Sequence, residues 1–347
     1  MSRGPGSKVR DGRRPLILLS AHGGLDHPGQ IQRPQTDFAA LAARVDGRIA
    51  RPGAGAPPVA AAEKRLRLGV SQAVRAWRSR ASVYVSLSER VGIPLSLLRP
   101  DAPHVMVAHL LTSREKRLAA RRTEFLRRTD VTLVFSTEQE RYLREDVGLD
   151  EQQAQFIWDK VDHRFFAPGA PAGGEGYVLS VGREQRDYAT LIDALRPLKV
   201  PSVIVPGSTW SHRGLGALSV PEHVQIRQDL SYPELRRLYQ GARLVVVPVH
   251  PGTRYAAGVN GILEGMACAR PVIATDTPGL DGYVEDGVNG REVAAGDPAA
   301  LRSVIHELWE ERGRAEALGQ AGRETVVRGR TIDHFVDRVA GLMETLV

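Results

Sequence analysis

One carboxylate, Glu264, stands among small and apolar residues near the start of the stretch GVNGILEGMACARPVIATDTPGL, from position 258 to 280, whose other carboxylate, Asp276, lies near its end. Such surroundings normally exclude an unpaired charge. A glycine-rich loop, PVHPGTRYAAGVNG, precedes it and follows an apolar run typical of a buried strand. Glycines let backbone N–H groups approach a ligand, and the start of the next helix carries partial positive charge. The loop therefore suits a diphosphate, and Glu264, about one turn into that helix, suits the vicinal hydroxyls of a ribose.

Two arginines lie in a second loop, VGREQRDY. Arg183 follows a predicted strand and a glycine, and a guanidinium at the carboxyl end of a strand can hold phosphate oxygens in a bidentate fork. Arg186 is the nearest other cation in the same loop. The alternative for Arg183 is a surface ion pair with Glu184 or Asp187.

The elements that must position these residues follow from the hydrophobic pattern. Short apolar runs bounded by turn residues alternate with stretches of helical period, which indicates βαβ units and parallel sheets. The predicted fold class is α/β, with two Rossmann-like, doubly wound parallel-sheet domains that face a cleft. Strands are expected at 16–20, 82–86, 104–108, 131–136, 177–181, 202–205, 224–226, 244–247 and 271–275, and helices at 35–45, 63–79, 113–127, 138–146, 188–195, 232–240, 261–268, 298–310 and 314–326.

The division into domains follows from length and from one linker-like segment. A chain of 347 residues is longer than a single core usually supports, and FFAPGAPAGGEG is rich in Pro, Gly and Ala. We expect a disordered tail at residues 1–14, a first domain at 15–165, a second domain at 166–330 and a closing helix at 331–347.

Composition and charge restrict the functional class. Residues 1–150 hold 26 Lys and Arg against 15 Asp and Glu, whereas the remainder is net acidic. Nucleic acid is not the expected partner, because aromatic residues make up only 5% and no zinc-finger or RNP signature is present. The lone cysteine, Cys268, cannot form an internal disulfide, which suggests a cytoplasmic protein. No apolar run approaches the roughly 18 residues of a membrane span.

One stretch, EKRLRLGVSQAVRAWRSR, predicts a basic amphipathic helix. Leu66, Val70, Val74 and Trp77 fall near one helical face, with the arginines largely elsewhere. Such a helix can lie on an anionic membrane. Packing of the apolar stripe on a sheet is the favoured interpretation, so we do not expect membrane contact.

Four ordered blocks carry a resemblance to a known family. NGILEGMACARPVIATDTPGLDGYVEDGVNG, YVLSVGREQRDYATLIDAL, SYPELRRLYQGARLVVVP and VDHRFFAP resemble the motifs of the retaining, nucleotide-sugar-dependent glycosyltransferases of family 4, which have the GT-B architecture. The resemblance spans most of residues 100 to 340. It implies that the first domain faces the acceptor, that the second binds the nucleotide sugar and that the last helix crosses back to the first domain.

The resemblance also implies roles for individual residues. His109 would lie against the donor sugar, Gly23 and Gly24 would approach the donor phosphates, and Asp229 and Leu230 would lie near the base. One departure is Ala256, where the family typically carries the first of two glutamates. Recognition of the sugar is then left to Gly258, Val259, Asn260 and Gly261, and the acceptor would meet His22, Asp26, His27 and Gln30.

The activity that this resemblance implies is transfer of a hexosyl group, with retention, from a nucleoside diphosphate sugar to a hydroxylated acceptor. A UDP-sugar is favoured over a GDP-sugar. No cofactor and no metal are expected, because the chain contains no Asp-x-Asp triplet, and His22 and His27 lack a third clustered metal ligand. Two alternatives stay open: a GT-B nucleotide-sugar epimerase or hydrolase, and a non-catalytic protein that binds a nucleotide sugar or a membrane surface.

Overall fold

Two parallel sheets of six strands each form the core of the protein, as seen in a computed structural model that describes residues 14–19, 33–51, 61, 63, 68–169, 176–207 and 219–347. The first sheet has the strand order β2-β1-β3-β4-β5-β6. Its central strands are buried on both faces, as parallel sheets with helices on both sides require. The strands are β1 Leu16–Leu18, β2 Arg48–Ala50, β3 Tyr84–Ser86, β4 His104–Ala108, β5 Val131–Val134 and β6 Ala154–Phe156.

The second sheet has the order β12-β11-β10-β7-β8-β9. Its order reverses between β7 and β10, and in doubly wound sheets ligands bind beyond the carboxyl ends of strands at such a switch point. The loops that carry Arg183 and Gly258 follow these two strands. The strands are β7 Val178–Val181, β8 Ser202–Val205, β9 Val224–Ile226, β10 Leu244–Val247, β11 Val272–Asp276 and β12 Arg291–Ala294.

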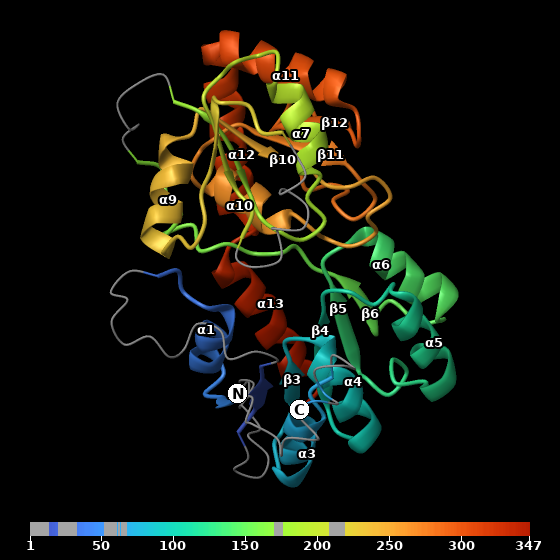
Figure 1. The fold of residues 1–347 in the computed structure, drawn as a ribbon. Coiled ribbons are helices and arrows are strands. Elements are labelled where there is room, and N and C mark those ends of the chain that lie inside the picture. Colours follow the sequence, from blue (N-terminus) through green and yellow to red (C-terminus); the bar gives the residue numbers. More distant parts are fainter. Residues whose placement is uncertain are drawn as a thin grey trace.

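Helices cover the sheets in both domains (Figure 1). The first domain has α1 Asp37–Arg44, α3 Val70–Arg78, α4 Glu89–Leu98, α5 Arg114–Thr123 and α6 Thr137–Arg141, which continues as one π-helical turn, Tyr142–Asp146. The second has α7 Tyr188–Leu195, α9 Tyr232–Gly241, α10 Val259–Ala267, α11 Pro298–Glu310 and α12 Arg312–Gly329. Within the described residues, no helix is both long and apolar enough to cross a bilayer.

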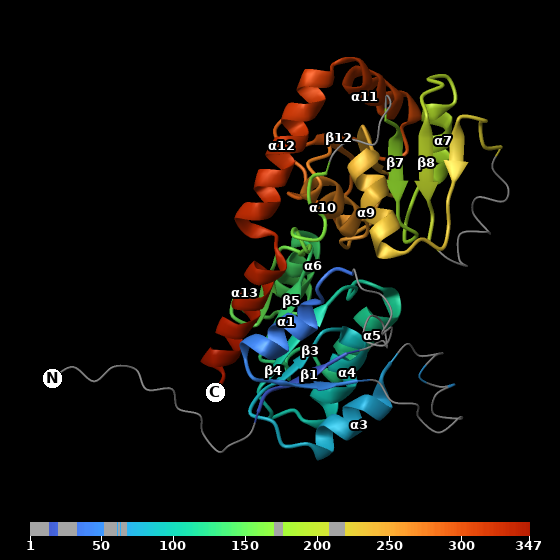
Figure 2. The same ribbon diagram turned by 90° about the vertical axis from the view of Figure 1, so that its left-hand side faces the viewer.

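The last helix, α13 Ile332–Thr345, returns to the first domain (Figure 2). Phe335, Val336 and Val339 are buried in the core around the first sheet. The two chain crossings between the domains run side by side, because the Val161 N–H donates to the Arg330 carbonyl at 3.1 Å and the Ile332 N–H donates to the Val161 carbonyl at 3.3 Å. These crossings form the hinge.

We expect Phe335→Ala to destabilise the protein by about 3 to 5 kcal/mol, because the ring is 2% exposed and its removal leaves a cavity in the core. Urea unfolding, followed by circular dichroism, measures this loss. Asp337→Ala on the same helix is the control, since its exposed pair with Arg44 contributes less than about 1 kcal/mol. Equal losses in the two variants would show that α13 does not anchor the first domain.

The predicted fold class is confirmed, but four elements were not predicted. Strands β2, β6 and β12 have only three or four residues each. Helix α4 contains Gly92 and Pro94 and is buried over most of its length, so it shows no apolar stripe. The prediction that the apolar stripe of the basic helix packs on the sheet was wrong. Helix α3 buries Gln72, Ala73 and Ala76 instead, and it leaves Val70 and Trp77 exposed.

Candidate active site

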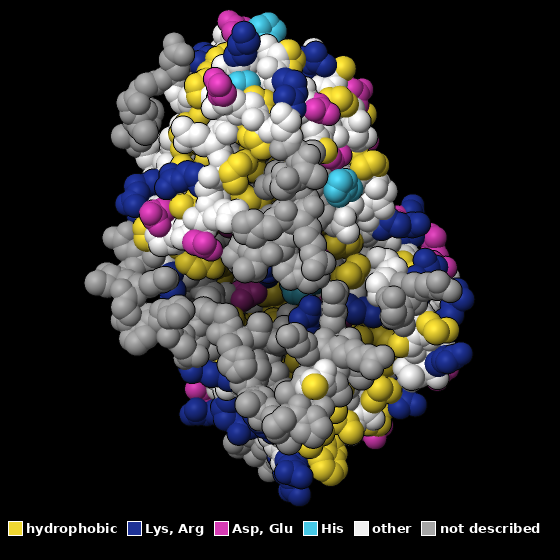
Figure 3. Space-filling model, in the orientation of Figure 1, with side chains coloured by type: hydrophobic (Ala, Val, Ile, Leu, Met, Phe, Trp, Pro, Cys, Tyr) yellow, Lys and Arg dark blue, Asp and Glu magenta, His cyan; other side chains and the backbone are white. Residues whose placement is uncertain are grey.

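A cleft of about 1220 Å³ lies between the two domains and is lined by both. Figure 3 shows acidic, basic and histidine side chains meeting in the recess between them. The wall from the second domain includes the residues that follow β7 and β10, and the wall from the first domain includes those that follow β3 and β4. All of these loops leave the carboxyl ends of parallel strands.

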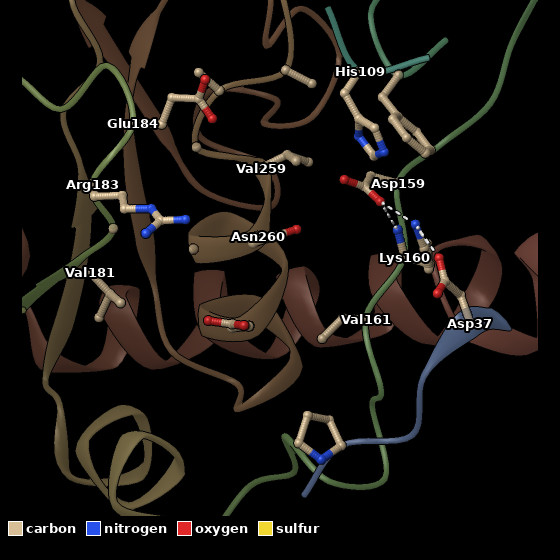
Figure 4. A pocket seen from close by; sticks show the side chains of 18 of the residues that line it. Asp37, His109, Asp159, Lys160, Val161, Val181, Arg183, Glu184, Val259 and Asn260 are labelled. Carbon is tan, nitrogen blue, oxygen red and sulfur yellow. Dashed lines mark hydrogen bonds and ion pairs between the residues drawn. The ribbon is translucent and has the colours of Figure 1, made fainter. Parts of the chain in front are cut away.

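Arg183 extends from the end of β7 toward the opening turn of α10, where Asn260 lies (Figure 4). Its side chain is exposed in the cleft. Neither carboxylate considered as its partner is engaged with it: Glu184 accepts a hydrogen bond from the Tyr255 hydroxyl at 2.9 Å, and Asp187 caps α7 by accepting from the Thr190 N–H at 3.0 Å. Among the described residues, no carboxylate pairs with Arg183, so the ion-pair alternative is wrong.

Arg186 is packed beneath the same wall. Its Nε donates to the Val181 carbonyl at 3.1 Å and its Nη1 donates to the Glu184 carbonyl at 3.0 Å. The guanidinium occupies the space beside Gly182, whose φ of 123° and lack of a Cβ are both required there. Burial lowers the pKa of Arg186, yet an arginine keeps its charge at neutral pH.

The start of α10 faces the cleft. Gly258, its N-cap residue, has a φ of 104°, and a Cβ there would lie 3.0 Å from the side chains of Val247 and Val249. No described side chain caps this helix, so its first N–H groups keep the capacity to bind an anion. The predicted residues Gly258, Val259, Asn260 and Gly261 all line the cleft.

Glu264 lines the cleft on the same helix. Burial raises its pKa from 4.5 to about 7, and the hydroxyl of Tyr239 and then the positive charge of Arg186 oppose this rise. The carboxylate therefore lies near a fixed cation and the Tyr239 hydroxyl, in surroundings that favour its protonated form until a ligand supplies further hydrogen bonds.

A consequence for stability follows from the raised pKa of Glu264. Between pH 4.5 and about 7 the unfolded chain loses this proton while the folded chain keeps it, so the contribution of Glu264 to folding stability falls as pH rises through that window. We expect Glu264→Gln to be more stable than the unsubstituted protein by about 1 to 3 kcal/mol at pH about 8. The difference should shrink toward pH 4.5, which melting curves across pH measure. A pH-independent difference would contradict the assigned pKa.

His109 follows β4 and faces the cleft from the first domain. Its backbone N–H donates to Glu89 at 3.0 Å, and its ring lies 5.2 Å from the ring of Phe135. Figure 4 shows the imidazole directed toward Asp159, a residue of the hinge. The imidazole Nε2 lies 3.3 Å from the Leu87 carbonyl oxygen.

A buried ion cluster at the floor of the cleft was not predicted. Lys160 lies 2.9 Å from Asp37 and 3.3 Å from Asp159, with its ammonium 4.3 Å from the ring centre of Phe335 and 4.8 Å from that of Phe135. Although burial opposes it, the two carboxylates raise the pKa of Lys160 overall. The cluster joins α1, β5, the hinge and α13. The charged pair within FIWDKVDHRFF was the available sequence signal.

Most of the remaining predicted site residues lie either away from the cleft or outside the described residues. Asp229 is exposed, Leu230 packs on the core of the second domain, and neither lines the cleft; Tyr232 and Leu235 of α9 do so instead. Ala256 does line it. His22, Gly23, Gly24, Asp26, His27 and Gln30 lie outside the described residues. Across the described ranges, no group of three or more His, Cys, Asp or Glu side chains could hold a metal ion.

Comparison with known proteins defines the second domain. Residues 175–311 match the family described as glycosyl transferases group 1. The match lies within the second domain and covers the loops that carry Arg183 and Gly258.

Two curated proteins illustrate the sequence similarity. A D-inositol 3-phosphate glycosyltransferase from Nocardiopsis dassonvillei is 28% identical over 288 residues, which is 73% of this chain and 66% of that protein. A putative glycosyltransferase, EpsD, from Bacillus subtilis is 34% identical over 110 residues, 31% of this chain and 29% of that protein. The chain thus spans less than two thirds of either relative.

Solved structures share the fold over nearly the whole chain. A sucrose-phosphate synthase from Thermosynechococcus elongatus has a TM-score of 0.74 at 17% identity and covers 96% of this chain and 99% of its own. Anabaena HepE in complex with UDP has a TM-score of 0.69 at 15% identity, with 96% and 100% covered. The two-domain architecture is that of GT-B glycosyltransferases.

Proposed function

We propose that the protein is a retaining glycosyltransferase that transfers a hexosyl group from a UDP-sugar to a hydroxylated small-molecule acceptor. The observation that carries this proposal is the convergence of Arg183, Arg186, the uncapped start of α10 and Glu264 at the switch point of the second sheet. Two cations and a helix dipole suit a diphosphate, and a carboxylate beside them suits a ribose. The sequence similarity to glycosyltransferases, and the fold shared with HepE, which was solved with UDP, support this proposal.

In the proposed reaction, negative charge grows on the departing diphosphate while positive charge grows on the sugar ring. Arg183, Arg186 and the N–H groups of α10 stabilise the leaving group without a metal ion. Ala256 leaves no carboxylate at its position in the cleft, so we favour front-face attack over a double displacement. The leaving diphosphate oxygen then accepts the proton of the acceptor hydroxyl. The first-domain wall, with His109 and Asp159, holds the transferred sugar.

Ligand-induced thermal stabilisation tests the donor. A ligand at about a hundred times its dissociation constant stabilises the folded state by about 2.7 kcal/mol, so a panel of UDP-, GDP- and dTDP-sugars should single out the UDP-sugar. If no nucleotide sugar raises the melting temperature, the proposal is wrong.

Product analysis separates transfer from the two alternatives. An epimerase or hydrolase consumes the donor without an acceptor, whereas a non-catalytic protein binds the donor and returns it unchanged. The proposed transferase instead yields a glycoside in amounts that depend on the added hydroxylated acceptor.

A further inference from the structure

Exposed apolar side chains gather on two adjacent helices at the outer end of the first domain. Trp77 is 46% exposed on α3, and Leu97 and Leu98 are 37% and 38% exposed on α4. The two helices pack along each other, and their C-terminal ends meet where Arg99 Nη1 donates to the Trp77 carbonyl at 3.5 Å. We call Trp77, Leu97 and Leu98 the tip patch. Figures 1 and 3 place α3 and the apolar surface near it at the end of the molecule away from the second domain.

The buried face of α3 is formed by residues other than Trp77. Helix α3 turns its small residues, Ala73 and Ala76, toward the sheet, and Gln72 donates to the Ala50 carbonyl at 2.8 Å. Small residues let the helix lie close to β1, and Trp77, at the edge of this buried face, keeps 46% of its surface exposed. The exposed part of a large aromatic side chain costs hydrophobic free energy unless another surface covers it.

The charges around the tip patch are almost all positive. Between residues 70 and 101 the sequence carries five arginines and two carboxylates. One carboxylate, Glu89, is buried and pairs with Lys116 at 2.6 Å, away from the patch. Arg78 and Arg80 are exposed and form no ion pair with any described residue. The other carboxylate, Asp101, is exposed in the turn that follows α4. The surface therefore combines a partly exposed indole and two leucines with the guanidinium groups of Arg78 and Arg80.

We infer that the tip patch docks on an anionic membrane surface. Indole rings prefer the interface between water and lipid, leucines enter the acyl boundary, and guanidinium groups bind lipid phosphates while their stems cover apolar surface. The patch lies on the protruding ends of two helices, a shape that suits a broad deformable surface. It also lies at the end of the first domain opposite the cleft, so docking leaves the cleft open. This inference is independent of the proposed transferase activity.

Vesicle co-sedimentation of the full chain tests the inference. We expect binding to vesicles of phosphatidylcholine mixed with phosphatidylglycerol and none to phosphatidylcholine alone. Raising NaCl from about 0.1 M to about 0.5 M should release most of the protein. The double variants Trp77→Ala/Leu98→Ala and Arg78→Glu/Arg80→Glu should each lower the partition coefficient at least about tenfold. Melting temperature confirms that these surface variants fold.

A matched control separates the patch from the general basic charge of the protein. Val327→Ala/Arg328→Glu on α12 also removes one exposed apolar side chain and reverses one arginine, but in the second domain. It should bind anionic vesicles as the unsubstituted protein does. Loss of binding in this control to the same extent as in the patch variants would overturn the inference, because charge alone would then explain binding. Absence of binding to anionic vesicles by the unsubstituted protein would overturn it as well, and would point to a protein partner.

Discussion

Replacing Glu264 with alanine is expected to lower kcat/KM for the nucleotide sugar by about a hundredfold, with most of the loss in KM. The proposed role of Glu264 is to accept hydrogen bonds from the two hydroxyls of the ribose, and hydrogen bonds to a charged group contribute about 1.5 to 3 kcal/mol each. The ribose does not react, so its binding supports ground state and transition state alike. Initial-rate kinetics with UDP-glucose measures the change.

Two controls make this result specific to Glu264. Glu264→Gln keeps the shape but offers a single acceptor oxygen, and should fall between alanine and glutamate. The affinity of the unsubstituted protein for UDP-glucose should also drop about tenfold from pH about 8 to pH about 6, because the pKa of Glu264 is near 7 and only the ionised form accepts two hydrogen bonds. UDP-glucose does not titrate in this range, since its diphosphate is a diester. An alanine variant with normal KM would rule out the ribose contact.

Arg183→Ala is expected to lower kcat by about a hundredfold to a thousandfold. Removal of one fixed donor that stabilises charge in the transition state typically has this effect. The side chain is exposed and makes no ion pair with any described residue, so the melting temperature should change little. Kinetics at saturating donor, together with melting curves, distinguishes a loss of chemistry from a loss of fold.

The comparison with other arginines sharpens this test. Arg183→Lys keeps a positive charge but loses the bidentate fork, so it should recover part of the rate. Arg196→Ala, at an exposed arginine of the same domain near Asp193, should be active. Arg186→Ala should lose both activity and stability, because that guanidinium holds two carbonyls of the loop. Full activity of Arg183→Ala would contradict the proposed stabilisation of the leaving group.

Much of the second-domain wall could be predicted because its residues are close together in sequence. Gly258 to Glu264 lie at the start of one helix, so their spacing in the sequence is enough to predict that they can contact the same ligand. Arg183 follows a strand whose apolar run sets its end, and α7, β8, β9, β10 and α11 begin and end where the hydrophobic pattern predicts. In these segments local periodicity and tertiary packing require the same arrangement.

The first-domain wall could not be predicted in the same way, because its contacts join distant segments. Lys160 contacts Asp37 from α1 and Phe335 from α13. No local sequence pattern predicts which carboxylate a buried lysine pairs with. The face of α3 was predicted wrongly for a related reason. Its apolar stripe satisfied the helical period, but the close approach of the helix to β1 favours the small residues Ala73 and Ala76.

The sequence by itself determined the α/β class, the order of most elements and the phosphate-binding character of two loops, since these depend on hydrophobic period, glycines and charges within a few residues of one another. Only the tertiary structure decided that the His109 imidazole is directed toward Asp159, that Arg186 packs against Gly182 and Gly258, and that Trp77 is partly exposed. Those outcomes depend on how the two sheets, the hinge and the returning helix α13 pack together. Steric fit between distant segments produces no periodic pattern in the sequence, so it cannot be predicted from local spacing.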